Sequence, residues 1–309
     1  MSEYKQIEKV VETPQFKLNQ EHYDKIVAAK ADRKLVYEVE LQPNTGDAFY
    51  LKPGWVLRLE QRHESVQITD WTWWRPDLKE FSSYANTFLV EGSYLRKYLR
   101  VWSSQHTDGP SGGMRPMATM IVDECPDDFG PGKLLGYVPH WWYYHCSPEW
   151  HMAGYSNLGP DFNSCHMNFY QAAMKLPAVA AIEDVEMRKL IANWIACTPN
   201  YQTFQPMKYL HDSTGQHRWD LKPCTPVPPG TGVEFYSEME QYCLISECPH
   251  GDQTVPIDKQ QLWPTYISVY DTSIKPLDPP KWGDWRSALE GQIERGEKDI
   301  SVRTPDSYK

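Results

Sequence analysis

Short runs in which apolar and polar residues alternate are the feature that most constrains how this chain can fold. The runs are rich in β-branched and aromatic residues, which favour strands, and turn-forming segments such as PNTGD and RHES separate them. Together with 25 prolines, this pattern predicts a β-rich α+β fold, with mostly antiparallel sheets and a few helices packed on them. The predicted strands cover residues 35–42, 49–61, 66–74, 117–125, 233–246 and 264–271, with a further strand pair within 84–102.

Helices are predicted where apolar residues recur at helical spacing. Residues 181–196 form one such segment, and residues 167–174, which follow Asn163-Ser164, form another. Ser147-Pro148-Glu149 also reads as a helix start, because it combines a hydroxyl cap, a proline at the first helical position and an early acid.

The change of pattern along the chain predicts three parts. Alternation begins at Lys34 and the last predicted strand ends near residue 272, so residues 34–272 are expected to form the main domain. Residues 1–33 are polar and have a composition that favours helix, and they are predicted to be an appended N-terminal arm. Residues 273–309 form a C-terminal extension rich in proline, tryptophan and charge. We expect it to wrap a surface or a neighbouring subunit, within a homo- or hetero-oligomer.

Composition excludes several classes of function. The formal net charge of −10 argues against a nucleic-acid surface, because no basic patch is available to displace counterions from phosphate. No apolar run approaches the roughly 20 residues that a membrane span needs. The N-terminus lacks the apolar stretch of a signal peptide, and seven cysteines, an odd number, fit a reducing compartment. A cytoplasmic protein that acts on a small molecule is therefore expected.

Histidine and cysteine are concentrated between Leu134 and Ala173, which hold four histidines and two cysteines. Both cysteines, Cys146 and Cys165, lie at predicted helix starts. There the helix dipole favours the thiolate, which is the form that binds metal or attacks carbon. A third cysteine, Cys248, follows a strand-like run. We expect the three cysteines to converge on one site.

A zinc site is the chemistry that these residues suggest. Catalytic zinc takes three ligands from cysteine, histidine and carboxylate, and uses a nearby carboxylate to move protons. The candidate ligands are Cys146, Cys165, Cys248 and His140, and Glu238 is the candidate proton carrier. The spacing alone is not decisive, because the chain has neither a CxxC pair nor an HExxH motif. Each residue also has a purely structural interpretation, since buried cysteines and histidines commonly serve only in packing.

Further candidates come from strand periodicity and from the tryptophans. In the predicted strand 233–246, alternate residues share a face, which would place Tyr236, Glu238 and Glu240 together. A tryptophan cluster that includes Trp73 and Trp142 could wall a pocket by cation–π contact, although packing is the more common role of such clusters.

Several ordered motifs resemble the urea carboxylase-associated family. They span roughly residues 34–272 and occur in the family's order. They are a strand ending at Asp70, His140 before Cys146-Ser147-Pro148-Glu149-Trp150, Ser164-Cys165-His166-Met167-Asn168, Ser237-Glu238-Met239-Glu240, Cys248-Pro249 and Pro264-Thr265-Tyr266.

The resemblance implies a zinc-binding, β-rich protein, and some members of the family form a two-subunit deiminase that removes ammonia from carboxyguanidine. Carried over by motif, the metal would lie near His140, Cys146, Cys165 and Cys248. The catalytic residues would be Glu238 as proton shuttle, Asn168 as an orienting amide, and Glu240. The candidates for substrate contact are Asp70, Trp73, Trp142 and Tyr236.

The favoured hypothesis is a zinc-dependent hydrolase of a C–N bond, of the deiminase or amidohydrolase type. One alternative is metal-free catalysis, with Cys146 as nucleophile and His140 as base. Another is a non-catalytic subunit or binding module that retains a structural zinc ion, closed by four ligands. Departures from the family pattern at Trp141, Ser164 and Gln205 favour the latter.

Overall fold

The computed structural model describes most of the chain in segments. These are residues 19–91, 101–106, 115–126, 140–143, 145–149, 163–198, 200–204, 209–211, 217–219, 225–252, 254–255, 261–278 and 291–297. The helices are α1 (Gln20–Ala28), the 3-10 helix η2 (Ala29–Asp32), α2 (Tyr84–Glu91), α4 (Cys165–Met174), α5 (Pro177–Ala180) and α6 (Val185–Ala196). The strands are β1 (Lys34–Leu41), β2 (Gly46–Leu51), β3 (Trp55–Gln61), β4 (Gln67–Trp74), β5 (Glu80–Ser82), β6 (Val101–His106), β7 (Pro116–Asp123), β8 (Trp141–Tyr143), β9 (Asn200–Thr203), β10 (Tyr209–His211), β11 (His217–Trp219), β12 (Thr231–Ser237), β13 (Gln241–Asp252) and β14 (Thr265–Asp271).

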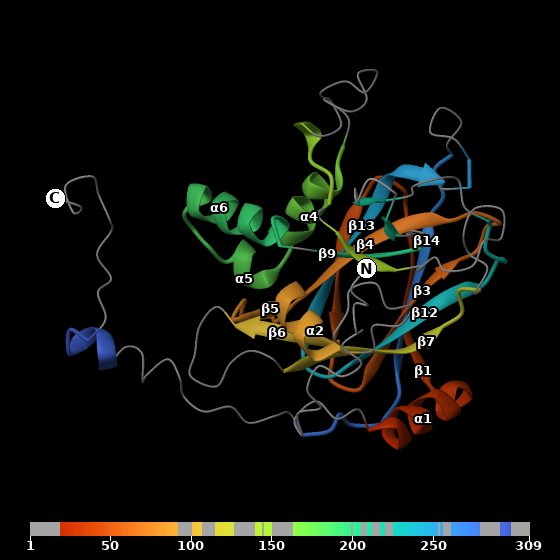
Figure 1. The fold of residues 1–309 in the computed structure, drawn as a ribbon, viewed down its shortest axis with the longest axis horizontal. Coiled ribbons are helices and arrows are strands. Elements are labelled where there is room, and N and C mark those ends of the chain that lie inside the picture. Colours follow the sequence, from red (N-terminus) through yellow and green to blue (C-terminus); the bar gives the residue numbers. More distant parts are fainter. Residues whose placement is uncertain are drawn as a thin grey trace, which may run out of the picture.

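One antiparallel sheet dominates the fold (Figure 1). Within the described residues it has 12 strands, ten of them in the order β1-β14-β3-β12-β7-β6-β5-β4-β13-β2. Strand β9 pairs with β4 and continues the sheet to β8. The sheet curves into a nearly closed barrel. The prediction of a β-rich fold with antiparallel sheets and a few helices is confirmed, although the sheet contributes more of the fold than an α+β description implies.

Large aromatic rings fill the interior of the barrel. The ring of Trp71 lies 4.7 to 5.1 Å, between centroids, from those of Trp102, Tyr201 and Phe235. These side chains are almost completely buried. Because successive side chains of β4 point to opposite faces of the sheet, Trp71 and Trp73 point into the barrel, whereas Asp70 points to the outer face.

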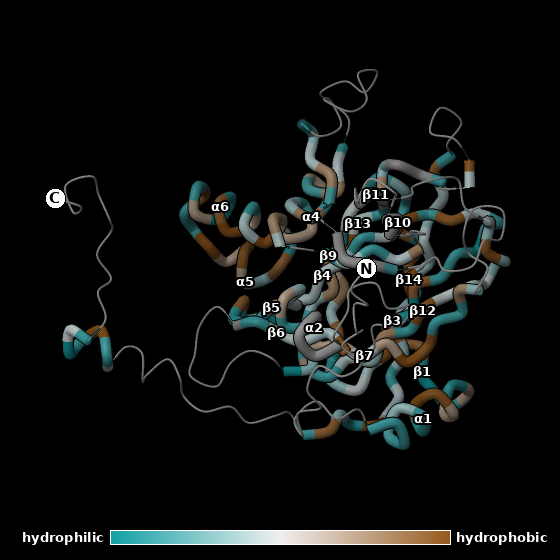
Figure 2. The backbone as a smooth tube through the Cα atoms, in the orientation of Figure 1, coloured by the Kyte–Doolittle hydropathy of each residue, from teal (hydrophilic) through white to brown (hydrophobic). Residues whose placement is uncertain are grey.

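The helices α4, α5 and α6 cover part of that outer face (Figure 1). Phe169, Ala172 and Ala173 of α4 pack with Leu244 of β13 and Trp74 of β4 in a second apolar core. Figure 2 shows apolar and polar residues interspersed along α6. Its buried residues are Ala192, Ile195 and Ala196, whereas the larger side chains of Val185, Met187, Leu190 and Trp194 are exposed.

The segment predicted to be an appended arm contributes a helix that packs on the sheet. In α1, Tyr23 and Ile26 are buried against a third apolar cluster that includes Tyr236. After it, the guanidinium of Arg33 donates to the buried carboxylate of Glu234 at 2.6 Å. The boundaries of the three predicted parts remain a prediction.

Three strand predictions need correction. The run 49–61 is divided between β2 and β3, because Lys52-Pro53-Gly54 makes a turn in which Gly54 has a φ of +87°. The run 233–246 is divided between β12 and β13, with a turn at residues 238–240. Within 84–102, where a strand pair was predicted, the described residues form α2 and the start of β6, and residues 92–100 lie outside the described part of the chain.

No helix among the described residues is long and apolar enough to cross a membrane.

Candidate metal centre

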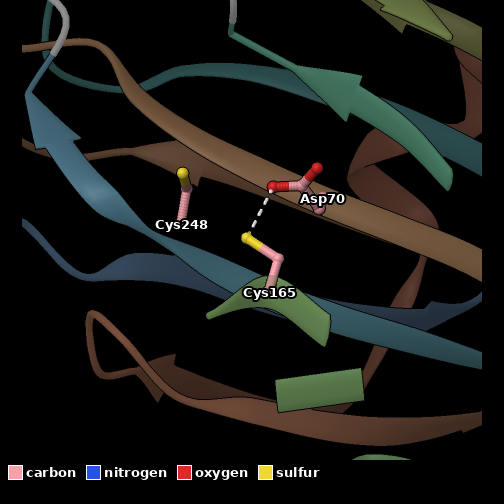
Figure 3. A group of neighbouring side chains, drawn as sticks. All are labelled: Asp70, Cys165 and Cys248. Atoms are coloured by element: carbon pink, nitrogen blue, oxygen red, sulfur yellow. Dashed lines mark hydrogen bonds between the residues drawn. The ribbon is translucent and has the colours of Figure 1, made fainter. Parts of the chain in front are cut away.

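Three buried side chains from distant parts of the chain meet between the outer face of the sheet and the start of α4. Asp70 comes from β4, Cys165 from the first turn of α4, and Cys248 from β13 (Figure 3). One carboxylate oxygen and the two sulfurs all lie within 4.8 Å of one another. The structure thus brings two of the predicted metal ligands together with Asp70, which was predicted to contact substrate.

The strand register explains why Asp70 and Cys248 share a site. Asp70 pairs with Ser246 across the β4–β13 ladder. Residues at alternate positions of a strand face the same side, so Cys248 points to the same face as Ser246 and Asp70.

Helix α4 delivers Cys165 to this face. The hydroxyl of Ser164 caps the helix by accepting the Met167 N–H at 3.2 Å, as the sequence predicted for a start near Asn163-Ser164. The side-chain amide of Asn168 donates to the Ser246 hydroxyl at 3.0 Å and accepts from Asn163 at 2.5 Å. Asn168 therefore fastens α4 to β13, so it orients the helix that carries a candidate ligand.

Cys146 lies beside Cys165. The backbone N–H of Cys165 donates to the Cys146 sulfur at 3.3 Å, and the backbone N–H of His166 donates to the Cys146 carbonyl at 3.1 Å. Residues 148 and 149 are helical, which confirms a helix start after Ser147. The sulfur of Cys146 thus accepts an N–H at the N-terminus of α4, where the helix dipole favours a thiolate.

The carboxylate of Asp70 is held from one side. Its Oδ1 accepts hydrogen bonds from the side-chain amides of Asn200 and of Gln202, the latter at 2.6 Å. Its Oδ2 accepts the Cys165 thiol at 3.3 Å. The two amides therefore fix one oxygen and direct the other toward the cysteines.

The electrostatics of the cluster favour a bound cation. Burial, aided by the nearby Cys146 sulfur, raises the pKa of Asp70 to about 7. Burial and the neighbouring Cys146 and Cys248 sulfurs raise the pKa of Cys165 well above its ordinary value. A divalent cation would reverse this penalty, because it stabilises thiolate and carboxylate directly. Since thiolate sulfur and carboxylate oxygen are donors that zinc accepts, Asp70, Cys165 and Cys248 fit a zinc ion, and Cys146 lies beside Cys165.

Two histidines next to the cysteines extend the site toward the surface. His145 Nδ1 lies 3.4 Å from Asn200 Oδ1, and His145 Nε2 lies 3.3 Å from His166 Nδ1. His166 Nε2 lies 2.9 Å from Asn193 Oδ1 on α6. Burial lowers the pKa of His145 to about 4, so this ring is neutral near pH 7.

His140 is not placed as a ligand of this cluster. Its ring is fully buried, and its Nδ1 accepts the Phe204 N–H at 3.3 Å. A ring whose Nδ1 accepts carries its proton on Nε2, which here lies 3.3 Å from Asp123 Oδ1. Nδ1 thus accepts a backbone N–H, whereas the buried Nε2 lies near Asp123 without a hydrogen bond of good geometry to a described residue. The structure thus groups His140 with Asp123 and Cys125, apart from the group of Asp70, Cys165 and Cys248, and its role as a metal ligand or as a base for Cys146 stays a prediction.

Asp123 and His140 also lie near Cys125, with one ligand atom from each within 4.8 Å of the others. A metal at His140 Nε2 would require the ring's proton on Nδ1, but Nδ1 accepts the Phe204 N–H. We therefore interpret this second group as a buried histidine–carboxylate pair beside a thiol.

Glu238 and Glu240 lie at the opposite end of β13 from Cys248. Residues 241 to 248 of an extended strand span roughly 20 Å. Glu238 accepts hydrogen bonds from Tyr23 at 2.7 Å and from Thr119 at 2.6 Å, and Glu240 is exposed and accepts from Tyr50. The structure thus separates both carboxylates from the cysteines, because the chain turns at residues 238–240 and β13 then runs away from them.

The predicted substrate contacts are also dispersed. Trp73 is buried inside the barrel, with its ring centroid 5.2 Å from that of Trp71. The hydroxyl of Tyr236 donates to the Ile274 carbonyl at 2.8 Å, and its ring packs near Tyr23. Strand β8 contains Trp142, whose side chain lies outside the described part of the structure. Of the four candidates, the structure places Asp70 at the cluster.

Sequence reasoning missed Asn200 and Gln202. They are two residues apart in the short strand NYQT, so both face Asp70. The signal that could have indicated them is the spacing in NYQT: two amide side chains lie on either side of an aromatic residue, so they share one face of the strand.

The fold is shared with a protein of known structure. The crystal structure of a DUF1989 family protein from Silicibacter pomeroyi DSS-3 matches with a TM-score of 0.64 and 19% sequence identity, over 92% of this chain and 96% of that chain. DUF1989 is the urea carboxylase-associated family that the motifs resemble. At this level of identity the likeness shows the fold. No protein-family model and no curated protein matches the chain.

Proposed function

We propose that this protein is a zinc-dependent hydrolase that acts on a C–N bond of a small guanidino, amidine, ureido or amide substrate. The observation that carries the proposal is the convergence of Asp70, Cys165 and Cys248, which come from three segments far apart in sequence, with Cys146 beside Cys165. The motifs that resemble a zinc-binding deiminase family and the shared fold support the same proposal.

In this proposal the thiolates of Cys146, Cys165 and Cys248 hold the ion. When bound, zinc would supply Lewis-acid activation of water and polarisation of the substrate. A zinc ion held by the three cysteines would have room for water as a further ligand, which is what distinguishes a catalytic site from a structural one.

Asp70 takes the role that the sequence suggested for Glu238. Its Oδ2 faces the cluster while Asn200 and Gln202 hold its Oδ1. A carboxylate fixed in this way can accept a proton from water and return it to the departing ammonia or amine. Because the pair of amides limits its rotation, the oxygen that moves the proton keeps its position through the reaction.

A second candidate function is a non-catalytic protein with a structural zinc ion. It is favoured by the closeness of Asp70 Oδ2 to the sulfurs, which would allow Asp70 to close the site as a fourth ligand.

The substitution Asp70→Asn distinguishes a zinc-dependent hydrolase from a protein with a structural zinc ion. Wild type and variant would be loaded with zinc and assayed for ammonia release from a panel of guanidines, ureas and amides. The hydrolase proposal predicts that Asp70→Asn retains zinc and loses at least about 100-fold in turnover. Loss of zinc from the variant, or no ammonia from any substrate with the zinc-loaded wild type, would favour the structural role. Glu238→Gln is the matched control, and we expect it to retain both zinc and turnover. The proposed oligomer and cytoplasmic location are separate predictions.

A further inference from the structure

A continuous chain of side-chain contacts leads from the surface to the carboxylate of Asp70. It begins at exposed Asn193 on α6, passes through His166 on α4 and His145 before Cys146, and reaches Asn200 on β9, whose amide donates to Asp70. The contacts from Asn193 to Asn200 are 2.9, 3.3 and 3.4 Å. The two histidines are the immediate neighbours of Cys146 and Cys165 in the sequence.

The carboxylate determines the tautomers of the inner part of this chain. Asp70 only accepts when ionised, so Asn200 presents its Nδ2 to Asp70 and its Oδ1 to His145. An amide oxygen also only accepts, so His145 carries its proton on Nδ1. The Nε2 of neutral His145 is then an acceptor for His166 Nδ1–H. A neutral His166 in this tautomer accepts at Nε2, so the Asn193 amide has to present its N–H there, with its O and N positions exchanged.

We propose that His145 is a positioning residue for the metal centre: it holds the Asn200 amide in the orientation that clamps Oδ1 of Asp70, and His166 holds His145 in the tautomer this requires. The proposal rests on the proposed zinc site. It assigns a role to two histidines that were not among the site residues predicted from the sequence.

The physical reason is that an amide can rotate by 180° at little cost unless both ends are engaged. If Asn200 turned, its oxygen would face Asp70 and the two acceptors would repel each other. Gln202 alone would then hold the carboxylate, and Oδ2 would no longer be fixed toward Cys165. Outer partners of metal centres that orient groups in this way commonly contribute about 10- to 100-fold to metal affinity or activity.

Two substitutions of the same residue test the proposal. His145→Asn keeps an N–H donor at the position of Nδ1, whereas His145→Leu removes it at similar volume. Zinc affinity would be measured by competition with a chromophoric chelator, and turnover would be measured where a substrate is known. We expect His145→Leu to weaken zinc binding or turnover by about 10- to 100-fold and His145→Asn to restore most of the loss. The control is His63→Leu, since His63 instead stacks on Trp263.

The second measurement is the tautomer itself, read from the ring 15N chemical shifts of histidine-labelled, metal-free protein. We expect a neutral His145 protonated at Nδ1, and loss of that preference in His166→Leu. An Nε2-protonated His145 in the wild type would overturn the proposal, as would equal zinc affinities for His145→Leu and wild type. If the wild type binds no zinc, the proposed function fails. In that case the tautomer of His145 alone tests the hydrogen-bond chain. A proton on Nδ1 would support the role of His145 in holding Asn200 against Asp70, and a proton on Nε2 would overturn it.

Discussion

The thiol of Cys165 lies 3.3 Å from Oδ2 of Asp70, although 95 residues separate them in sequence. The contact joins the first turn of a helix to the outer face of a barrel strand. Because both groups are buried and both would be anionic when ionised, the pair is costly by itself and favourable around a cation. This relationship is the basis of the proposed metal centre.

The approach of α4 to the sheet depends on Gly46. A Cβ at this buried position would collide with the backbone of Asn168. Gly46→Ala should therefore move α4, destabilise the protein by about 1–3 kcal/mol and weaken metal binding. Urea denaturation and zinc titration would check this. Gly291→Ala is the control, because the added carbon meets only the flexible end of Arg295, and its stability should not fall.

Glu238 should make stability depend on pH. Burial raises the pKa of its carboxyl from 4.5 to about 7. The folded state thus holds this proton more tightly than the unfolded state, so its contribution to stability is present below about pH 4.5 and is lost as pH rises through 7. Glu238→Gln cannot titrate. The difference in free energy of unfolding between Glu238→Gln and wild type should therefore change by about 1–3 kcal/mol in favour of the variant as pH rises from 4 to 8.

Urea denaturation of both proteins at several pH values would measure the effect. The exposed Glu240→Gln is the matched control. A difference between wild type and Glu238→Gln that stays constant across this range would contradict the account.

The packing of the N-terminal segment against the sheet depends on a buried carboxylate, that of Glu234, which pairs with two arginines. Glu234 is fully buried and accepts from Arg33 at 2.6 Å and from Arg58 at 3.1 Å. Glu234→Gln should cost about 3–5 kcal/mol, because it leaves two buried guanidinium groups without their shared carboxylate. The partly exposed pair of Glu38 and Arg62 offers a comparison, and Glu38→Gln should cost at most about 1 kcal/mol. Equal losses from the two variants would show that Glu234 does not have this role.

His140 should be dispensable for metal. His140→Gln keeps a donor near Asp123, so we expect a loss of about 1–3 kcal/mol in stability and unchanged zinc content. Elemental analysis of the folded variant would decide. Zinc loss from a variant that retains its circular dichroism spectrum would make His140 a ligand after all.

The sequence predicted those parts of the site that depend on local signals. The caps at Ser147 and Ser164 and the polar–apolar alternation of β4 are local, and they correctly placed Cys165 at a helix start and Asp70 on a strand. Cys248 was predicted to follow a strand, whereas β13 continues to Asp252 and contains it. The sequence failed where a turn or a long-range contact decides. Glu238 shares its alternation with Glu240, but the turn between β12 and β13 takes both away from the cysteines. Asn200 is 130 residues from Asp70, and no periodicity shows that β9 pairs with β4.

The most direct test of the account is the zinc content of purified wild type and of Cys165→Ser, with Cys197→Ser as control, since Cys197 is exposed on the surface. The proteins would be purified without chelators and analysed by elemental mass spectrometry. The account predicts about one zinc ion per chain in wild type and in Cys197→Ser, and loss of the ion from Cys165→Ser while the fold is retained. Absence of zinc from the wild type after zinc loading, or full zinc content in Cys165→Ser, would contradict it.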